Sequence, residues 1–296
     1  MHRADITAEL ARRLVAEQFP QWADLPVRGV DLDGWDNTTF RLGDAMSVRL
    51  PSGEWYAPQV AKEHRWLPVL APRLPLQIPV PLAEGAPGCG YPWPWSVYRW
   101  LDGEPLAPGL VTDLPQFAAD LAGFLAALYA ADPADGPPPG QHTCFRGAPL
   151  TVYDAETRAA LAALDGQIDA AGAADVWAAA LRATWAGSPV WFHGDISPGN
   201  LLVRDGRLSA VIDFGCSGVG DPACDTVISW TFLTGESRRV FMDELPVDEG
   251  AWARGRGWAI WKAMIVLVDA LRSDPADAEE CKRVISEIIA DHKAAR

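Results

Sequence analysis

The strongest constraint on this chain is a pair of polar segments that each follow a short apolar run. Residues 190–203 read Val-Trp-Phe-His-Gly-Asp-Ile-Ser-Pro-Gly-Asn-Leu-Leu-Val, and residues 211–215 read Val-Ile-Asp-Phe-Gly. Apolar runs of this length are typical of buried strands, and the Pro and Gly residues between them are typical of loops. The pattern predicts that Asp195, Asn200 and Asp213 lie at the ends of neighbouring strands, where Gly215 permits a sharp turn.

These three side chains suit the transfer of a phosphoryl group. That reaction needs Mg²⁺ held by oxygen ligands, and a carboxylate that accepts the proton of the attacking hydroxyl. Asn200 and Asp213 would bind the metal, and Asp195 would be the base. Taken singly, an Asp at a strand end is more often a capping or turn residue. We interpret His193 as a hydrogen-bonded structural residue.

The two segments together are more specific for a kinase than any one of these residues is alone. His-Gly-Asp, four residues, Asn and then a strand ending in Asp-Phe-Gly follow the order and spacing of the kinase signature. With Gly194 in the second position and Gly-Asp-Pro-Ala-Cys-Asp at 220–225, the chain resembles the aminoglycoside phosphotransferase family of small-molecule kinases. The resemblance implies that Asp195 is the catalytic base, and that Asn200 and Asp213 bind Mg²⁺ with ATP or GTP as donor. Asp221 and Asp225 look structural, and we expect Asp225 to cap the next helix, with contact to the substrate as the alternative.

Hydrophobic periodicity and turn signals divide the chain into two parts. Helices are predicted over 5–18 and 57–70, and strands over 27–32, 38–42, 47–50, 78–83 and 96–100. Beyond residue 100, helices are predicted over 113–131, 154–171, 173–186, 225–233, 237–244, 248–271 and 274–290, with strands over 190–192, 201–203 and 208–212. We therefore expect an α+β, two-lobed, protein-kinase-like fold. A β-rich nucleotide-binding lobe would span residues 1–101, and a helical catalytic and substrate-binding lobe residues 102–296.

The N-terminal lobe contains candidates for binding the phosphates. Residues 34–40 form a strand-turn-strand pattern in which Asn37 and Thr38 could bind phosphate, although an ordinary hairpin explains the segment equally well. The family has a lysine on the following strand, paired with a helix glutamate, and this chain has Arg49 there. Arginine grips phosphate bidentately but does not replace lysine equivalently. Glu63 is its expected partner, unless Glu63 forms a surface pair with a neighbour on its helix.

The expected purine site lies at the join of the two lobes. Residues 96–101 would offer backbone groups to the base, and Tyr98 and Trp100 are the candidate aromatic contacts. The same aromatic density is also what a buried edge strand shows. Neither reading is excluded by the sequence.

Charge and composition limit the partners. The net charge of −14 and the isoelectric point of about 4.7 argue against nucleic acid and anionic membrane surfaces. The acidity permits a cationic acceptor, or it simply keeps the protein soluble. The apolar stretch over 258–271 is too short and too charged to span a bilayer, and no signal-peptide core follows the N-terminus. With five cysteines and no metal-binding spacing, we expect reduced thiols and a cytoplasmic protein.

The acceptor is the least determined feature. By the resemblance it would lie among the C-terminal helices, where acidic and Trp residues could wall a site for an amine-bearing sugar. They are Asp243, Glu244, Asp248, Glu249, Asp269, Trp230, Trp252, Trp258 and Trp261. Core packing and helix-dipole effects explain the same residues. An aminoglycoside or similar antibiotic kinase, a metabolic kinase for choline, homoserine or sugars, and an inactive nucleotide-binding pseudokinase all remain open, and the oligomeric state is not indicated.

Overall fold

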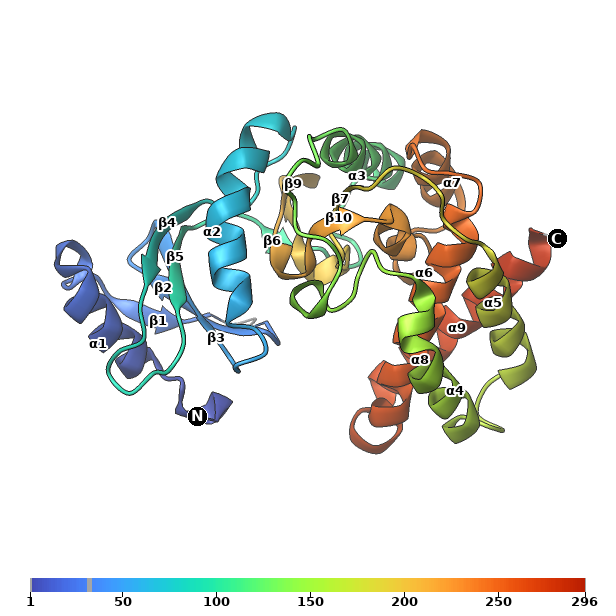
Figure 1. The fold of residues 1–296 in the computed structure, drawn as a ribbon, viewed down its shortest axis with the longest axis horizontal. Coiled ribbons are helices and arrows are strands. Elements are labelled where there is room, and N and C mark those ends of the chain that lie inside the picture. The colour runs from blue at the N-terminus through green and yellow to red at the C-terminus, as the bar shows by residue number, and fades with distance from the viewer. Residues whose placement is uncertain (1, 31–33, 296) are drawn as a thin grey trace.

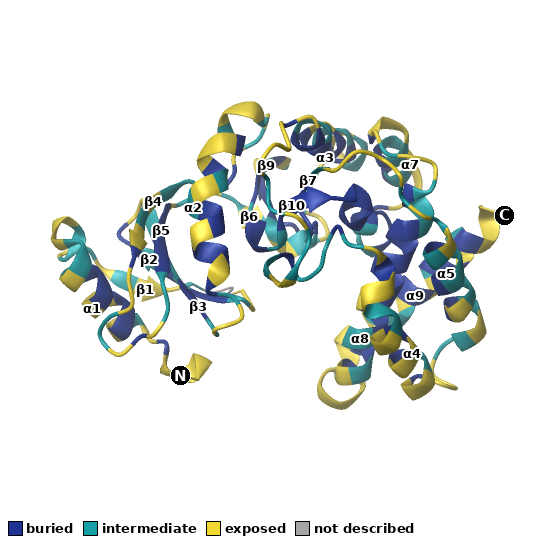
Figure 2. Ribbon diagram, in the orientation of Figure 1, coloured by how far each residue is buried: buried dark blue, intermediate teal, exposed yellow. Residues whose placement is uncertain are grey.

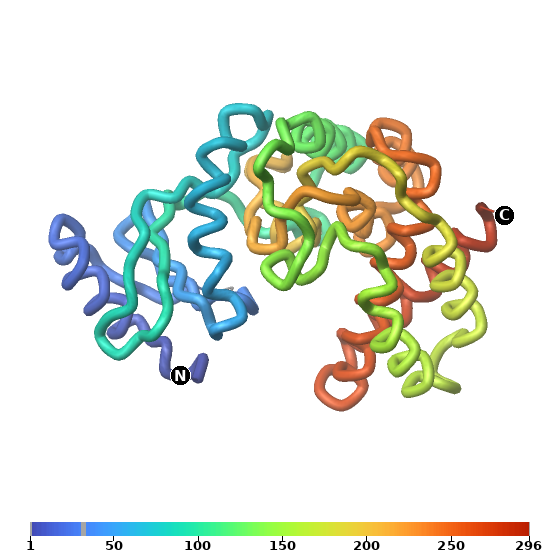
Figure 3. The backbone as a smooth tube through the Cα atoms, in the orientation of Figure 1, coloured from blue at the N-terminus to red at the C-terminus, as the bar shows by residue number. Residues whose placement is uncertain are grey.

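The computed structural model describes residues 2–30 and 34–295, and it is elongated, with an N-terminal antiparallel sheet followed by a mostly helical region (Figure 1). The backbone trace in Figure 3 shows the blue-to-cyan N-terminal part and the green-to-red C-terminal part side by side along the longest axis. The predicted α+β, protein-kinase-like arrangement is therefore confirmed. The lobe boundary between residues 101 and 102 stays a prediction.

The N-terminal sheet has five strands in the order β1-β2-β3-β5-β4. They are β1 (Val27–Gly29), β2 (Asn37–Leu42), β3 (Met46–Pro51), β4 (Pro81–Gly85) and β5 (Trp95–Arg99). Strands β2 and β3 form a hairpin in which Leu42 pairs with Met46, and Gly43 has the positive φ of 57° that this tight turn requires.

A helix lies on each face of this sheet (Figure 1). Helix α1 (Ala8–Gln18) starts at Thr7, whose hydroxyl accepts a hydrogen bond from the Leu10 amide, and its apolar stripe packs against the sheet. Helix α2 (Pro58–Leu70) covers the opposite face, and its Lys62 contacts the C-terminal part. The buried ammonium donates to the carbonyls of His142, Gly215 and Ser217 at 2.8, 2.6 and 3.0 Å. Lys62 thereby ties the two parts together.

The C-terminal part combines helices with two small sheets. The helices are α3 (Leu114–Tyr129), α4 (Asp154–Ala163), α5 (Ala170–Arg182), α6 (Ile228–Thr231), α7 (Gly235–Glu244), α8 (Ala251–Ser273) and α9 (Pro275–Ala294). One sheet has the order β6-β8-β9, with β6 (Glu104–Pro105), β8 (Leu201–Arg204) and β9 (Arg207–Val211). The other pairs β7 (Val190–Phe192) with β10 (Gly218–Gly220).

Two buried clusters form the core of the C-terminal part, where Figure 2 shows many dark blue segments facing inward. One cluster packs α3 and α7 on β8 and β9, and the other packs α4, α5, α8 and α9 together. Strand β7 lies at their junction, because Trp191 belongs to the first cluster and Phe192 to the second. Alternation along a strand places successive side chains on opposite faces. The segment that follows β7 is therefore anchored on both sides.

Several predicted boundaries were wrong. The predicted helices 154–171 and 173–186 are separated earlier, because Gly166 adopts φ 74° and Asp169 caps α5 by accepting from the Gly172 amide. The predicted helix 225–233 begins in the 3-10 helix Pro222–Val227 and continues as the short α6, which ends at Thr231. The strand predicted over 27–32 ends at Gly29, and its residues 31–32 lie outside the described residues. Strands β6 and β10 were not predicted.

All five cysteines are free. Over residues 2–30 and 34–295, no helix is long and apolar enough to cross a membrane.

The most buried ion pair should contribute strongly to stability. Arg254 on α8 donates to Asp221 at 2.7 and 3.1 Å and to Asp248 at 3.0 and 2.6 Å. Arg254→Leu would leave the buried Asp221 carboxylate without its partner, so we expect a loss of about 3–5 kcal/mol in the free energy of unfolding. Urea denaturation followed by circular dichroism measures this loss.

Arg272→Leu is the matched control, because its pair with Asp269 joins side chains that are 80% and 81% exposed. That variant should change stability by less than about 1 kcal/mol. Equal effects of the two substitutions would contradict a structural role for the buried pair.

Candidate active site

The loop after β7 places Asp195. Gly194 has φ 86°, and a Cβ there would lie 2.6 Å from the Cys216 carbonyl oxygen, so only glycine fits between the two motifs. The buried His193 ring donates from Nε2 to the Ile212 carbonyl at 3.0 Å and accepts at Nδ1 from the Asp195 amide at 3.2 Å. Burial lowers the pKa of His193, which keeps the ring neutral and able to do both. The structural interpretation of His193 agrees with these contacts.

Asp225 has a different role from the one predicted. It caps no helix. Its buried carboxylate accepts hydrogen bonds from the His193 amide at 2.9 Å and the Gly194 amide at 2.6 Å. Asp221 is the residue that caps, since it accepts from the Ala223 amide at the start of the 3-10 helix. The capping prediction for Asp225 was wrong because the chain folds its side chain back under the Asp195 loop.

Asn200 orients the Asp195 carboxylate. Its side-chain nitrogen donates to Asp195 Oδ2 at 2.8 Å and to the Asp195 carbonyl at 2.9 Å. The backbone carbonyl of Asn200 accepts a hydrogen bond from the Ile212 amide at 2.9 Å, which connects this loop to the residue before Asp213. Within the described chain the side-chain oxygen of Asn200 accepts no hydrogen bond. That oxygen is therefore available to a cation or a donor group.

Asp213 and Arg49 meet across the two parts of the molecule. Asp213 is in the left-handed region, with φ 65° and ψ 72°, and accepts from the Gly215 amide at 3.3 Å. Its Oδ1 lies 3.5 Å from Arg49 Nη2, while Arg49 Nη1 lies 3.7 Å from Glu63 Oε2. Burial opposes the charge on Arg49, but attraction by Glu63 and Asp213 raises the pKa of the guanidinium. The expected pair of Arg49 with Glu63 is present, and a second carboxylate joins it.

The remaining predicted nucleotide contacts lie on β2, β5 and the chain after it. Tyr98 is buried, and its hydroxyl donates to Glu63. Trp100 stacks on the Arg41 guanidinium, 3.8 Å from the ring centre. Asn37 and Thr38 are buried at the start of β2, and the Thr38 hydroxyl has no hydrogen-bond partner among the described residues. Roles for these four residues in nucleotide binding stay predictions.

Asp36 lies in the predicted segment 34–40 but was not singled out there, and its side chain lies beside this cluster. Its carboxylate accepts from the Gln59 side chain at 3.2 Å, and burial followed by the charge of Asp213 raises its pKa. Even so, among the described residues no group of three or more His, Cys, Asp or Glu side chains is close enough to hold a metal ion. Mg²⁺ commonly binds one or two protein oxygens together with substrate phosphates. Asn200 and Asp213 fit that donor set.

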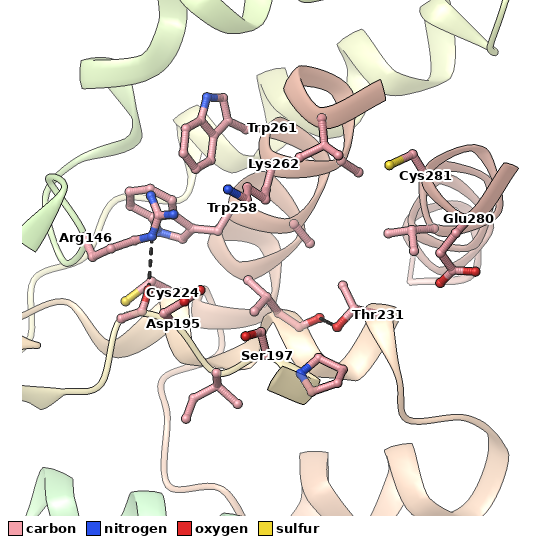
Figure 4. Close-up of a pocket in the computed structure, with 18 residues that line it drawn as sticks. Arg146, Asp195, Ser197, Cys224, Thr231, Trp258, Trp261, Lys262, Glu280 and Cys281 are labelled. Atoms are coloured by element: carbon pink, nitrogen blue, oxygen red, sulfur yellow. Dashed lines mark hydrogen bonds between the residues drawn. The ribbon is translucent and has the colours of Figure 1, made fainter. Parts of the chain in front are cut away.

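A cavity of about 320 Å³ opens next to Asp195 (Figure 4). Its walls come from the Asp195 loop, α8 and α9, and Trp258, Trp261 and Arg146 form one side. Of the acidic and Trp residues considered for the acceptor site, only Trp258 and Trp261 line it. Sequence reasoning missed Arg146, because it sits in an irregular segment with no motif around it.

Comparison with known proteins assigns the chain to a family. The sequence profile described as "Phosphotransferase enzyme family" matches residues 29–258. No curated protein matches. This match covers most of the chain. Together with the two-lobed fold and the positions of Asp195 and Asp213, it defines the class as a protein-kinase-like phosphotransferase. The chain belongs to the phosphotransferase enzyme family.

Solved structures share this fold at low sequence identity. The GDP complex of aminoglycoside 2′-phosphotransferase-IIIa aligns with a TM-score of 0.72 at 19% identity, covering 97% of this chain and 100% of that one. The GDP and kanamycin complex of the same type of enzyme gives 0.71 at 20% identity, covering 95% and 98%. Macrolide 2′-phosphotransferase MphH from Brachybacterium faecium gives 0.61 at 21% identity, covering 94% and 97%.

Asp225 should make stability depend on pH. Burial raises its pKa to about 7, whereas an unfolded aspartate titrates near 4. Between these values the native carboxyl keeps a proton that the unfolded chain has lost, so stability falls as pH rises. From pH 5 to pH 8 wild type should lose about 2 kcal/mol relative to Asp225→Asn, measured by thermal denaturation. If the difference in stability between wild type and Asp225→Asn is the same at pH 5 and pH 8, Asp225 is ionised over this whole range.

Proposed function

We propose that this enzyme transfers the γ-phosphate of Mg²⁺-bound ATP or GTP to a hydroxyl of a small molecule. The observation that carries the proposal is the position of Asp195. Its carboxylate accepts a hydrogen bond from the Asn200 side chain at 2.8 Å and borders the cavity. The backbone carbonyl of Asn200 accepts from the amide of Ile212, the residue before Asp213. A hydroxyl in the cavity would thus meet a carboxylate at the edge of a candidate metal and phosphate site.

Asp195 is the proposed base. It would orient the acceptor hydroxyl and take its proton as the oxygen bonds to the γ-phosphorus, and the nucleoside diphosphate would leave with the electrons of the broken P–O bond. The hydrogen bond from Asn200 fixes the carboxylate, so little rotation is needed before reaction. The neutral His193 holds the loop and takes no proton in this scheme.

Asn200 and Asp213 are the proposed metal ligands. Both present oxygen atoms, and the Asn200 side-chain oxygen has no partner in the described structure. When bound, Mg²⁺ would neutralise charge on the phosphate oxygens. Arg49 would bind the phosphates, with Glu63 holding its position, and Asn37 and Thr38 would lie over them. Tyr98 and Trp100 are proposed contacts at the purine end.

The acceptor class can be narrowed by the cavity. The acidic composition favoured an amine-rich antibiotic, and one relative was solved with kanamycin. However, the carboxylates that line the cavity are Asp195 and Glu280, and Glu280 pairs with Arg283 at 2.6 Å. The Trp and Val side chains in its walls suit a more apolar acceptor, as a macrolide-type or metabolic kinase would need. The complete set of Asp195, Asn200 and Asp213 argues against a pseudokinase.

Asp195→Ala should lower acceptor-dependent release of nucleoside diphosphate by about 10²–10⁴-fold, because the general base is removed. A coupled assay with Mg-ATP and Mg-GTP against aminoglycosides, macrolides, choline, homoserine and sugars measures it. Nucleotide affinity should stay nearly unchanged in this variant and weaken in Asp213→Ala. The exposed Asp243→Ala is the control, with wild-type rates expected. Loss of nucleotide binding in Asp195→Ala would assign the carboxylate another role.

Arg49→Met should weaken nucleotide binding by about 10–100-fold, because a charge-assisted contact with the phosphates is lost. Arg49→Lys keeps the charge without the fork and should recover part of the affinity. Titration calorimetry with Mg-ADP and Mg-GDP gives the dissociation constants. Full affinity in folded Arg49→Met would show that Arg49 serves only to join Glu63 and Asp213.

A further inference from the structure

The cavity beside Asp195 has an apolar wall and a cationic edge. Trp258 and Trp261 pack edge to face, with ring centres 5.8 Å apart, and Val227, Val266 and Val284 line the cavity as well. Arg146 enters from the loop before α4, and Lys262 extends from α8 toward the side on which Arg146 lies (Figure 4). An apolar body and an anionic group could therefore be held together.

Arg146 has unused hydrogen-bonding capacity at this site. Its guanidinium lies over Trp258 and Trp261, 5.1 and 4.7 Å from their ring centres. Its Nε donates to the Gly194 carbonyl at 3.1 Å, which fixes it next to the Asp195 loop. Nη1 is buried without a partner, and Nη2 forms no hydrogen bond among the described residues. An arginine held in this way presents donors in the fork geometry that matches a carboxylate.

Both cations that line the cavity are without an ion-pair partner among the described residues. Lys262 is exposed and forms no ion pair among the described residues, and Arg146 forms none there either. Glu280 is already paired with Arg283, and Asp195 is held by Asn200 at the edge of the proposed phosphate site. Arg146, which lies beside the Asp195 loop, and Lys262 on α8 therefore give the cavity wall two cationic groups without an ion pair among the described residues, although the whole chain carries a net charge of −14.

We propose that the acceptor is an amphipathic hydroxy acid whose carboxylate binds Arg146 and Lys262. Its apolar body would pack on Trp258 and Trp261, and its hydroxyl would face Asp195. The carboxylate only anchors the molecule, and phosphate is transferred to the hydroxyl. This inference rests on the proposed function. An acceptor amine in the same place would meet two like charges, so the site discriminates by charge as well as by fit.

The test uses three probes with the same apolar body and hydroxyl. They are 6-(hydroxymethyl)-2-naphthoic acid, neutral 2,6-bis(hydroxymethyl)naphthalene, and the ammonium compound 6-(aminomethyl)-2-(hydroxymethyl)naphthalene. Calorimetry without nucleotide should show the acid binding about tenfold or more tightly than the neutral probe, as expected for a charge-assisted contact, with the ammonium probe weakest. Equal affinities, or tighter binding of the ammonium probe, would overturn the proposal.

Variants then locate the anion site. Lys262→Met removes an exposed side chain and should fold normally, and it should reduce the preference for the acid several-fold. Arg146→Met should remove most of the remaining preference. Lys282→Met is the control and should keep the full preference, because Lys282 does not line the cavity and pairs with Glu279 at 2.9 Å. A preference that survives Lys262→Met and folded Arg146→Met would contradict the assignment.

Nucleoside diphosphate release separates this inference from the proposed function. Acid-selective binding with no release on adding Mg-ATP or Mg-GTP would support the anion site and count against phosphoryl transfer to such acceptors. Release that falls equally for the acid and neutral probes in Arg146→Met, with binding unchanged, would place the guanidinium on the transferred phosphate. That result would overturn the carboxylate assignment.

Discussion

The buried charge of Arg49 is the interaction on which the candidate site depends. A guanidinium in this position needs carboxylate partners, and it has Glu63 of α2 at 3.7 Å and Asp213 of the C-terminal part at 3.5 Å. Lys62, one residue before Glu63, adds three hydrogen bonds to carbonyls across the same junction. Helix α2 therefore contacts Arg49 of the sheet through Glu63, and it contacts the Asp-Phe-Gly segment of the C-terminal part through Lys62. The two parts are held in the arrangement that brings β3 next to Asp213.

A buried carboxyl group, that of Asp225, organises the Asp195 loop. Asp225 accepts the amides of His193 and Gly194, the neutral His193 ring joins the Asp195 amide to the Ile212 carbonyl, and Gly194 leaves room for Cys216. Each contact satisfies a backbone group that burial would otherwise leave unpaired. Main-chain atoms thus link the segment 193–200, which follows β7, to the segment 212–216, which follows β9. The cavity, by contrast, is walled by side chains of α8 and α9 that take no part in these links.

Much of the fold and the centre of the site could be predicted from the sequence. Strong periodicity indicated α3, α8 and α9, and the turn at Gly43 indicated the β2–β3 hairpin, because these signals are local. Short elements were harder to predict. Strands β6 and β10 are two and three residues long, and they exist because β8 and β7 offer them partners. The helix break at Gly166 was missed because alanine-rich sequence on both sides gives no strong contrast.

The sequence by itself determined which residues are the candidates for the chemistry, because Asp195, Asn200 and Asp213 follow the order and spacing of the kinase signature. It also indicated Glu63 as the partner of Arg49. Only the tertiary structure decided that Asp225 holds the Asp195 loop, and that Arg146 and Lys262 share one cavity. The physical reason is distance along the chain. Turn and strand preferences act between near neighbours, whereas contacts between residues far apart in the sequence depend on how the elements pack.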